Sequence, residues 1–276
     1  MNRPIAIFDS GVGGFTVVKD IIRLLPHESV VYVGDTARAP YGTKAATEII
    51  QFADEICAYL MKFDPKLIVI ACNTATAIAL QYLQKKYAIP IIGVIEAGVR
   101  SALKASKGGP IGVIGTNATI NSQAYEQEIR KRNPFVEVIS YACPSFVPLV
   151  EQGKYEAEEA CEKVKQELYQ LAQHRIDCLI LGCTHYPFLK GSIQRVLGHE
   201  VKLIHSGYET AKQVKALLVE RREDGYMFSP KITDESHVFV CSGALDLFRE
   251  IGKKWLADDL YGRSCEWKTM QKITIS

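Results

Sequence analysis

The chain has 276 residues, of which 47% are hydrophobic and 23% charged, and its formal net charge is +2. This balance is typical of a soluble globular protein and argues against direct nucleic-acid binding through a strongly basic surface. No apolar run approaches the ~20 residues that a membrane span requires. The sequence enters its first strand without a signal peptide, so we expect a cytoplasmic protein of about two domains.

Short β-branched runs alternate with helical patterns along the chain, which predicts an α/β fold with a mainly parallel sheet. Strands are predicted at 4–9, 30–34, 67–71, 89–94, 110–115, 135–141, 176–182, 201–205 and 237–241. Helices are predicted at 15–25, 43–63, 75–87, 96–106, 119–132, 156–174, 187–197, 208–222 and 244–257. The mixed, polar tail after Leu256 indicates no particular structure.

The clearest break in the chain is the loop 104–110, which holds two glycines and a proline. The strand that follows it looks like the start of a second sheet. Two internal echoes support this division: segment 8–11 is similar to segment 114–117, and the surroundings of Cys72 are similar to those of Cys183. We therefore expect two related α/β halves, with internal duplication as a hypothesis.

Cys72 and Cys183 each follow a short, continuous apolar strand and precede small polar residues. Ligands bind at the carboxyl ends of the strands in a parallel α/β sheet. Two thiols in matching places therefore predict one site built from two half-sites, as a two-base proton transfer at a single carbon would need. The helix expected after each cysteine would favour a thiolate and an anionic ligand.

The alternative is that these thiols pack as small hydrophobic side chains, which is common for free cysteines. For Cys72 and Cys183 both interpretations stay open at this point. Packing is the expected role of the others that lie in predicted strands or helices, namely Cys57, Cys161, Cys178 and Cys241. Eight cysteines are too few for a disulfide scaffold of this length.

A metal site and a dithiol redox pair are both disfavoured. The chain has no C-x-x-C motif, and its nearest spacing joins Cys178 and Cys183. Cys183 and His185 would need two further ligands that the nearby sequence does not supply.

Two further loops follow predicted strands. Segment 9–14, Asp-Ser-Gly-Val-Gly-Gly, is not a dinucleotide fingerprint, because Thr16 stands where glycine is needed. It is either a simple strand–helix turn or a loop that lines a small anionic ligand, with Asp9 as a titratable neighbour. The stretch 34–42 is long for such a loop, which favours function over a surface turn.

His185 is either structural or, because it lies so close to Cys183, a proton-transfer group.

Four motifs in this order and spacing make the chain similar to bacterial glutamate racemase, in the cofactor-independent aspartate/glutamate racemase family: segment 9–14, Pro40-Tyr41-Gly42, Cys72-Asn73-Thr74 and Cys183-Thr184-His185. The resemblance covers roughly residues 4–257. It implies two similar doubly wound α/β domains with the active site in the cleft between them. Domain I would be discontinuous, at 1–94 and 206–276, and domain II would span 95–205.

The resemblance also implies the activity: interconversion of L- and D-glutamate for peptidoglycan synthesis, with no cofactor and no metal. The protein would be a homodimer with glutamate as its substrate. Cys72 would deprotonate D-glutamate and Cys183 would deprotonate L-glutamate. Since an unperturbed thiol has a pKa of about 8.5, modest stabilisation would give thiolate near neutral pH.

The site residues carry over by position from the same resemblance. Asp9 would assist Cys72 and His185 would assist Cys183, while Asp35 and Glu151 are acidic positions linked to the active site. Residues implied to contact the substrate are Asp9, Ser10, Tyr41, Gly42, Asn73, Thr74, Thr116, Thr119, Thr184 and His185.

One position departs from the family pattern. His205 stands where members often have Asp or Ser, which bears on local polarity or interdomain packing. Only three residues precede the first strand, so we expect no N-terminal extension of the kind linked to activation by a cell-wall precursor.

The alternatives to a glutamate racemase are a racemase for aspartate or another amino acid, and a non-catalytic regulator of a partner such as DNA gyrase.

Overall fold

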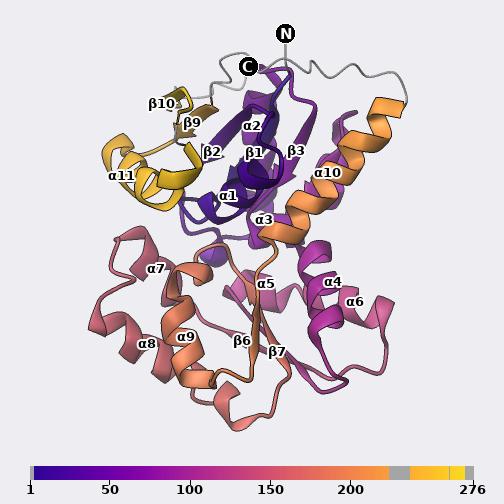
Figure 1. Cartoon of the computed structure of the whole chain (residues 1–276), viewed down its shortest axis with the longest axis vertical. Helices are drawn as coiled ribbons and strands as arrows, with labels where there is room; N and C mark the ends of the chain where they lie inside the picture. The colour runs from indigo at the N-terminus through magenta and orange to yellow at the C-terminus, as the bar shows by residue number, and fades with distance from the viewer. Residues whose placement is uncertain (1–2, 224–236, 261, 271–276) are drawn as a thin grey trace.

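Two separate parallel β-sheets organise the chain, one in each half of an elongated molecule (Figure 1). The computed structural model describes residues 3–223, 237–260 and 262–270. Within these residues the first sheet has six strands in the order β10-β9-β2-β1-β3-β4, and the second has four in the order β6-β5-β7-β8. Every strand pair is parallel.

The strands of the six-stranded sheet are β1 (Ile5–Asp9), β2 (Val30–Gly34), β3 (Leu67–Ile70), β4 (Ile91–Gly93), β9 (His237–Cys241) and β10 (Cys265–Thr269). Those of the four-stranded sheet are β5 (Ile111–Gly115), β6 (Val138–Ala142), β7 (Cys178–Gly182) and β8 (Lys202–Ile204). The α-helices are α1 (Phe15–Leu24), α2 (Ala46–Met61), α3 (Asn73–Lys86), α4 (Ile95–Ala105), α5 (Asn117–Asn121), α6 (Ala124–Arg132), α7 (Phe146–Glu151), α8 (Glu158–Leu168), α9 (Lys190–Leu197), α10 (Gly207–Glu223) and α11 (Leu245–Leu256).

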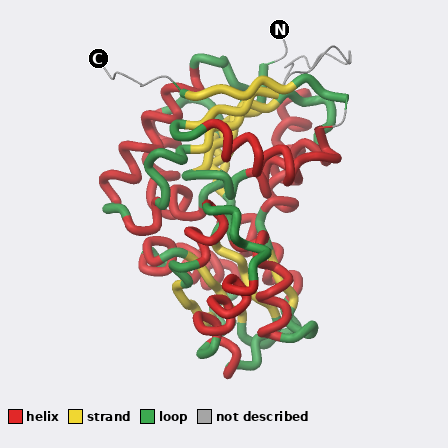
Figure 2. The backbone as a smooth tube through the Cα atoms, turned by 90° about the vertical axis from the view of Figure 1, so that its left-hand side faces the viewer, coloured by secondary structure: helices red, strands yellow, loops and turns green. Residues whose placement is uncertain are grey.

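Helices cover both faces of each sheet, so that the strands lie between helical layers (Figure 2). In β1, Ile5 and Ile7 join the core beneath α1, whereas Ala6 and Phe8 join the core beneath α2 and α3. Successive side chains of a strand point to opposite faces. Burial on both faces therefore requires continuous apolar strands, which explains why these strands are recognisable in the sequence.

The two halves share one topology. The order β2-β1-β3-β4 in the first sheet corresponds to β6-β5-β7-β8 in the second. Cys72 follows β3 and Cys183 follows β7, so the two thiols occupy equivalent positions. The predicted doubly wound α/β fold with two related halves is confirmed, while duplication as its origin stays a hypothesis.

The predicted domain boundaries keep the status of a prediction, although each sheet takes its strands from within them. Ile95, Val99 and Ala102 of α4 pack in the core of the four-stranded sheet. This packing supports a crossing near residue 95, as predicted. Among the described residues, no helix combines the length and the apolar character needed to span a membrane.

Several helix predictions were too long. The helix predicted at 43–63 starts only at Ala46, because Tyr41–Thr43 forms a 3₁₀ turn, η1. The one predicted at 119–132 is two helices, since Gln123 has a left-handed φ of 56° between them. The one predicted at 156–174 ends at Leu168, and Leu171–Gln173 forms a second 3₁₀ turn, η2.

Two elements have no counterpart in the prediction. α7 has only six residues and includes Pro148, so it shows no helical period. β10 has a mixed sequence and lies at the sheet edge, where Trp267 stacks on Phe239 with ring centroids 4.4 Å apart. Such short or half-exposed segments carry little periodic signal.

The aromatic core beneath β9 yields a stability prediction. Phe239 is 0% exposed and packs between Phe15 and Trp267. We expect Phe239→Ala to lower the free energy of unfolding by roughly 3–5 kcal/mol, because it removes a buried ring and leaves a cavity. Urea denaturation measures this change. Phe135→Ala is the control: Phe135 is 95% exposed, so a change within about 0.5 kcal/mol is expected. Equal effects of the two substitutions would contradict this core.

Candidate active site

The two cysteines face one small cavity between the halves, at the carboxyl ends of β3 and β7. The cavity holds about 260 Å³ of empty space. The residues that line it are Ser10, Pro40, Tyr41, Gly42, Cys72, Asn73, Thr74, Thr116, Val147, Cys183, Thr184 and His185. Both sheets therefore contribute to one site.

Cys72 caps the N-terminus of α3 and is nearly buried. Its Sγ accepts a hydrogen bond from the Ala75 N–H at 3.4 Å, and its thiol donates to Ser10 Oγ at 3.7 Å. Burial raises the pKa of Cys72 to about 12, and the Asp9 carboxylate adds to the increase. The N–H at the helix N-terminus favours the thiolate, as expected, but desolvation outweighs this hydrogen bond and the net pKa is raised.

Cys183 begins a hydrogen-bonded chain that continues through His185 to Glu151. The Cys183 Sγ lies 3.5 Å from His185 Nδ1, and His185 Nε2 lies 2.5 Å from Glu151 Oε1. Burial alone would lower the pKa of His185, but Cys183 and Glu151 together raise it well above its usual value. The raised pKa favours a protonated imidazole beside the Cys183 sulfur.

The chain after Cys183 differs from the prediction. A 3₁₀ turn, η3 (Tyr186–Leu189), precedes α9, so no α-helix begins directly after this cysteine. The group beside its sulfur is the His185 ring.

Asp9 joins the two halves behind the cavity wall. It is fully buried at the end of β1, where Oδ1 accepts the Gly11 N–H at 3.0 Å and Oδ2 accepts the Thr184 hydroxyl at 2.9 Å. Burial raises the pKa of Asp9 to about 6, and the neighbouring His185 opposes this increase. Asp9 does not line the cavity, so it acts on the site through Thr184 and through its charge.

The glycine-rich segment 9–14 is more than a strand–helix turn, because it docks onto the second half. A β-carbon on Gly13 would lie 2.5 Å from Thr184 Oγ1, and one on Gly11 would lie 2.0 Å from Glu151 Oε1. The Val12 N–H donates to that same Glu151 oxygen at 3.1 Å. Only glycine permits this approach. Ser10 is the residue of the segment that lines the cavity.

Three buried threonines form a second contact across the halves. The Thr74 hydroxyl lies 2.9 Å from that of Thr116 and 3.0 Å from that of Thr119. Thr116 also caps α5, since its hydroxyl accepts the Thr119 N–H at 3.2 Å. Thr74 and Thr116 line the cavity, whereas Thr119 supports them from behind.

Asp35 lies behind the wall of the cavity, where its carboxylate is fully occupied. It accepts hydrogen bonds from the Tyr41 hydroxyl at 2.5 Å, from Arg38 Nε at 2.7 Å and from the Ser242 hydroxyl at 2.6 Å. Asp35 therefore holds Tyr41 over the cavity through a hydrogen bond. Asp35 itself does not line the cavity.

Most residues that the sequence nominated come together here. Those that line the cavity are Ser10, Tyr41, Gly42, Cys72, Asn73, Thr74, Thr116, Cys183, Thr184 and His185, and those that lie behind it are Asp9, Asp35, Thr119 and Glu151. Two lining residues were not nominated. Pro40 belongs to the motif Pro40-Tyr41-Gly42, whereas Val147 lies in the unpredicted helix α7 and had no sequence signal.

His205 lies at the turn after β8 and faces the first half. Its Nδ1 is 3.7 Å from Asp20 Oδ2 on α1. It also borders a second small space, together with Asn73 and Cys183, and does not line the main cavity. The departure from the family pattern therefore bears on packing between the halves.

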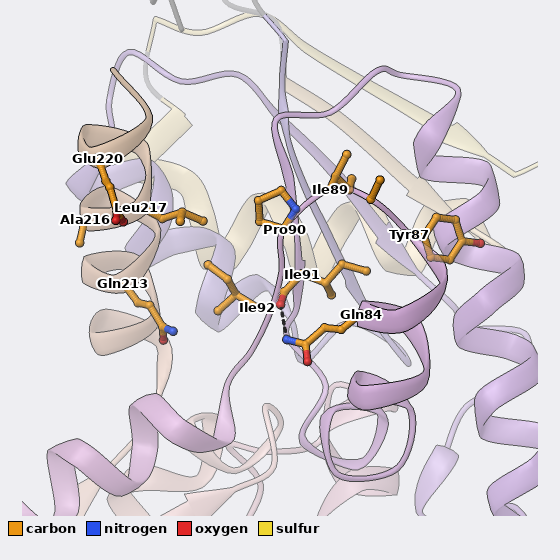
Figure 3. Close-up of a pocket in the computed structure, with 11 residues that line it drawn as sticks. Gln84, Tyr87, Ile89, Pro90, Ile91, Ile92, Gln213, Ala216, Leu217 and Glu220 are labelled. Atoms are coloured by element: carbon orange, nitrogen blue, oxygen red, sulfur yellow. Dashed lines mark hydrogen bonds between the residues drawn. The ribbon is translucent and has the colours of Figure 1, made fainter. Parts of the chain in front are cut away.

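A larger cavity lies elsewhere, between α10 and the segment that joins α3 to β4 (Figure 3). It holds about 1170 Å³ of empty space, and its lining has one carboxylate, Glu220, and no cysteine or histidine. Size alone is thus a poor guide to the reactive site here. Within the described residues, no three His, Cys, Asp or Glu side chains group together as metal ligands.

Comparison with known proteins places these features in a family. Residues 13–214 match the Asp/Glu/hydantoin racemase family. The glutamate racemase of Bacillus cereus is 45% identical over 260 residues, which cover 94% of this chain and 95% of the relative. The crystal structure of a glutamate racemase isoform from Bacillus anthracis is similar, with a TM-score of 0.89 at 38% identity over 99% of both chains. The structure from Francisella tularensis, in complex with D-glutamate, has a TM-score of 0.86 at 38% identity over 98% of this chain and 97% of that chain.

The buried Asp9 carboxyl predicts a pH-dependent stability difference. The pKa of Asp9 rises from 3.8 to about 6 on folding. Between these two pH values the folded protein holds a proton on Asp9 that the unfolded chain has lost. Ionising Asp9 as the pH rises therefore destabilises the fold. We expect the unfolding free energy of Asp9→Asn, relative to the parent, to rise by about 2 kcal/mol between about pH 4.5 and pH 7.

Urea titrations at the two pH values measure this difference. Asp246→Asn is the matched control, because the Asp246 side chain is 93% exposed and is expected to contribute almost nothing. A difference for Asp9→Asn that is constant with pH would contradict the protonation assigned to this carboxyl.

Proposed function

The chain belongs to the Asp/Glu/hydantoin racemase family, and we propose that it interconverts L- and D-glutamate by proton transfer at Cα between Cys72 and Cys183. The observation that carries the proposal is the placement of two thiols, at equivalent strand ends of the two halves, around one cavity. Two such groups on opposite sides of a carbon can remove a proton from one face and return another to the opposite face.

The reaction starts from a Cys183 thiolate and a Cys72 thiol. Cys183 takes the α-proton of L-glutamate, and Cys72 gives its own proton to the opposite face, which yields D-glutamate. The enzyme is then left with a Cys183 thiol and a Cys72 thiolate, the form that accepts D-glutamate. The assignment of each cysteine to an enantiomer follows the family resemblance.

The surroundings of the thiols support this starting form. The Cys183 sulfur lies beside His185, whose raised pKa favours a protonated imidazole, whereas the raised pKa of Cys72 keeps its proton in place. The ammonium group of bound D-glutamate would favour the Cys72 thiolate when the reaction runs in the other direction. The enantiomers have equal free energies, so kcat/KM must be the same in both directions, but kcat and KM are free to differ.

Neutral donors in the cavity suit a dicarboxylate substrate. The lining contains the hydroxyls of Ser10, Thr74, Thr116 and Thr184 and the amide of Asn73, with no Lys or Arg. Hydrogen bonds from such preorganised donors stabilise the charge that moves onto the α-carboxylate when Cα loses its proton. These donors are buried, and the low local dielectric strengthens such contacts.

Other substrates and roles are less well supported. The relatives that match nearly the whole chain are glutamate racemases, which favours glutamate over aspartate. Both cysteines are in place, which argues against a purely regulatory protein. Five statements stay predictions: the supply of D-glutamate for peptidoglycan, catalysis without a cofactor, the cytoplasmic location, the homodimer and the DNA gyrase contact.

Circular dichroism of L-glutamate solutions tests the activity directly. Purified protein, dialysed against a chelator and given no cofactor, is expected to remove the optical signal of L-glutamate and to leave that of L-aspartate almost unchanged. Folded protein that leaves the L-glutamate signal intact would contradict the proposal, and selective loss of the L-aspartate signal would point to the alternative substrate.

Single cysteine variants separate the two half-reactions. We expect Cys72→Ala and Cys183→Ala each to lower racemisation by at least about 10³-fold, because each lacks one proton-transfer group. In D₂O, Cys72→Ala should still exchange the α-hydrogen of L-glutamate, and Cys183→Ala that of D-glutamate. Proton NMR follows both reactions.

Cys57→Ala is the matched control, because Cys57 is 0% exposed and packs in the core beneath α2, away from the cavity. Its turnover is expected to stay within about twofold of the parent. Racemisation at the parental rate by either active-site variant would rule out the two-base assignment.

A further inference from the structure

Tyr125 of α6 makes a buried hydrogen bond across the two halves. Its hydroxyl donates to Asn73 Oδ1 at 2.6 Å, and both residues are buried. Asn73 directly follows Cys72, so the bond ties a helix of the four-stranded half to the cysteine loop of the six-stranded half. Burial raises the pKa of Tyr125, which keeps its hydroxyl protonated and able to donate.

The Tyr125 ring also contacts the other cysteine loop. A β-carbon on Gly182 would lie 3.0 Å from Tyr125 Cε2. Gly182 is the last residue of β7 and directly precedes Cys183. One side chain therefore touches the residue before one thiol and bonds to the residue after the other.

This bond decides what the Asn73 side chain presents to the cavity. With Oδ1 held by Tyr125, Asn73 Nδ2 has no hydrogen-bond partner among the described residues, and Asn73 lines the cavity. An amide N–H directed there donates to a carboxylate. If the amide turned over, its oxygen would face the carboxylate and repel it.

We propose that Tyr125 is a positioning residue for racemisation: its hydroxyl fixes the Asn73 amide with the nitrogen toward the substrate carboxylate, and its ring sets the strand end that carries Cys183. The proposal rests on the function proposed above. Tyr125 does not itself line the cavity, so its effect on the reaction passes through Asn73 and β7.

Tyr125→Phe removes the hydroxyl and keeps the ring. We expect kcat/KM for L-glutamate to fall about tenfold, the typical effect of losing one buried hydrogen bond that orients a binding group. Proton NMR in D₂O measures the rate, because loss of the α-hydrogen signal remains detectable in slow variants. The thermal unfolding midpoint reports whether the fold is intact.

Tyr87→Phe is the matched control. Tyr87 caps the other end of α3, where its hydroxyl donates to Asp54 Oδ1 at 2.8 Å, away from the cysteines. It loses a partly buried hydroxyl bond to a carboxylate, and its kcat/KM should stay within about twofold of the parent.

A double-mutant cycle separates positioning from general packing. If Tyr125 acts through Asn73, Tyr125→Phe introduced into Asn73→Ala should lower kcat/KM by less than about twofold. A full tenfold loss in that background, or parental activity of the single Tyr125→Phe variant, would overturn the proposal. An inactive parent protein would instead contradict the proposed function, so the two failures are distinguishable.

Discussion

A buried hydrogen bond from the Thr184 hydroxyl to the Asp9 carboxylate joins the two halves of the protein at the point where both cysteine loops meet. Neither half alone contains a site, because each supplies one thiol. The two sheets must therefore approach closely at their carboxyl ends. Gly13 allows that approach, since any β-carbon there would overlap Thr184 and His185. The threonine cluster and the bond between Tyr125 and Asn73 also join the two halves, at the start of α3.

The two buried thiols have different neighbours. Both are nearly inaccessible, at 5% exposure for Cys72 and 7% for Cys183. Cys183 has the His185 imidazole beside it, and Glu151 behind that ring helps to raise the pKa of His185. Cys72 has an N–H group and a hydroxyl, and faces the buried Asp9, so its neutral form is favoured. Two positions with the same topology thus differ in their chemical surroundings.

The sequence predicts the features that rest on simple patterns. Continuous apolar strands such as 67–71 must be buried on both faces, and Cys72 and Cys183 follow such strands, so their positions at the sheet ends are predictable. β10 and α7 are not, because a half-exposed edge strand and a six-residue helix have no clear period. As a result Val147, which α7 brings to the cavity, was missed.

Electrostatic behaviour is also poorly predicted from sequence. The helix after Cys72 suggests a thiol with a lowered pKa. Burial, which depends on how the two halves pack, raises that pKa instead. Asp35 is similar: the sequence cannot tell that Arg38, Tyr41 and Ser242 occupy its carboxylate. The partners of Tyr125 come from distant segments, so its place beside both cysteine loops follows only from the fold.

The central claim, that separate thiols act on opposite faces of Cα, is tested most directly by initial-rate labelling in D₂O. Starting from L-glutamate, the two-thiol account predicts that the first D-glutamate formed carries deuterium at Cα, because its proton comes from a Cys72 thiol that exchanges with solvent. Deuterium should enter the remaining L-glutamate more slowly, since Cys183 can return the proton it removed before that proton exchanges with solvent. D-glutamate that retains the original α-hydrogen would mean that a single base serves both faces, and would contradict the account.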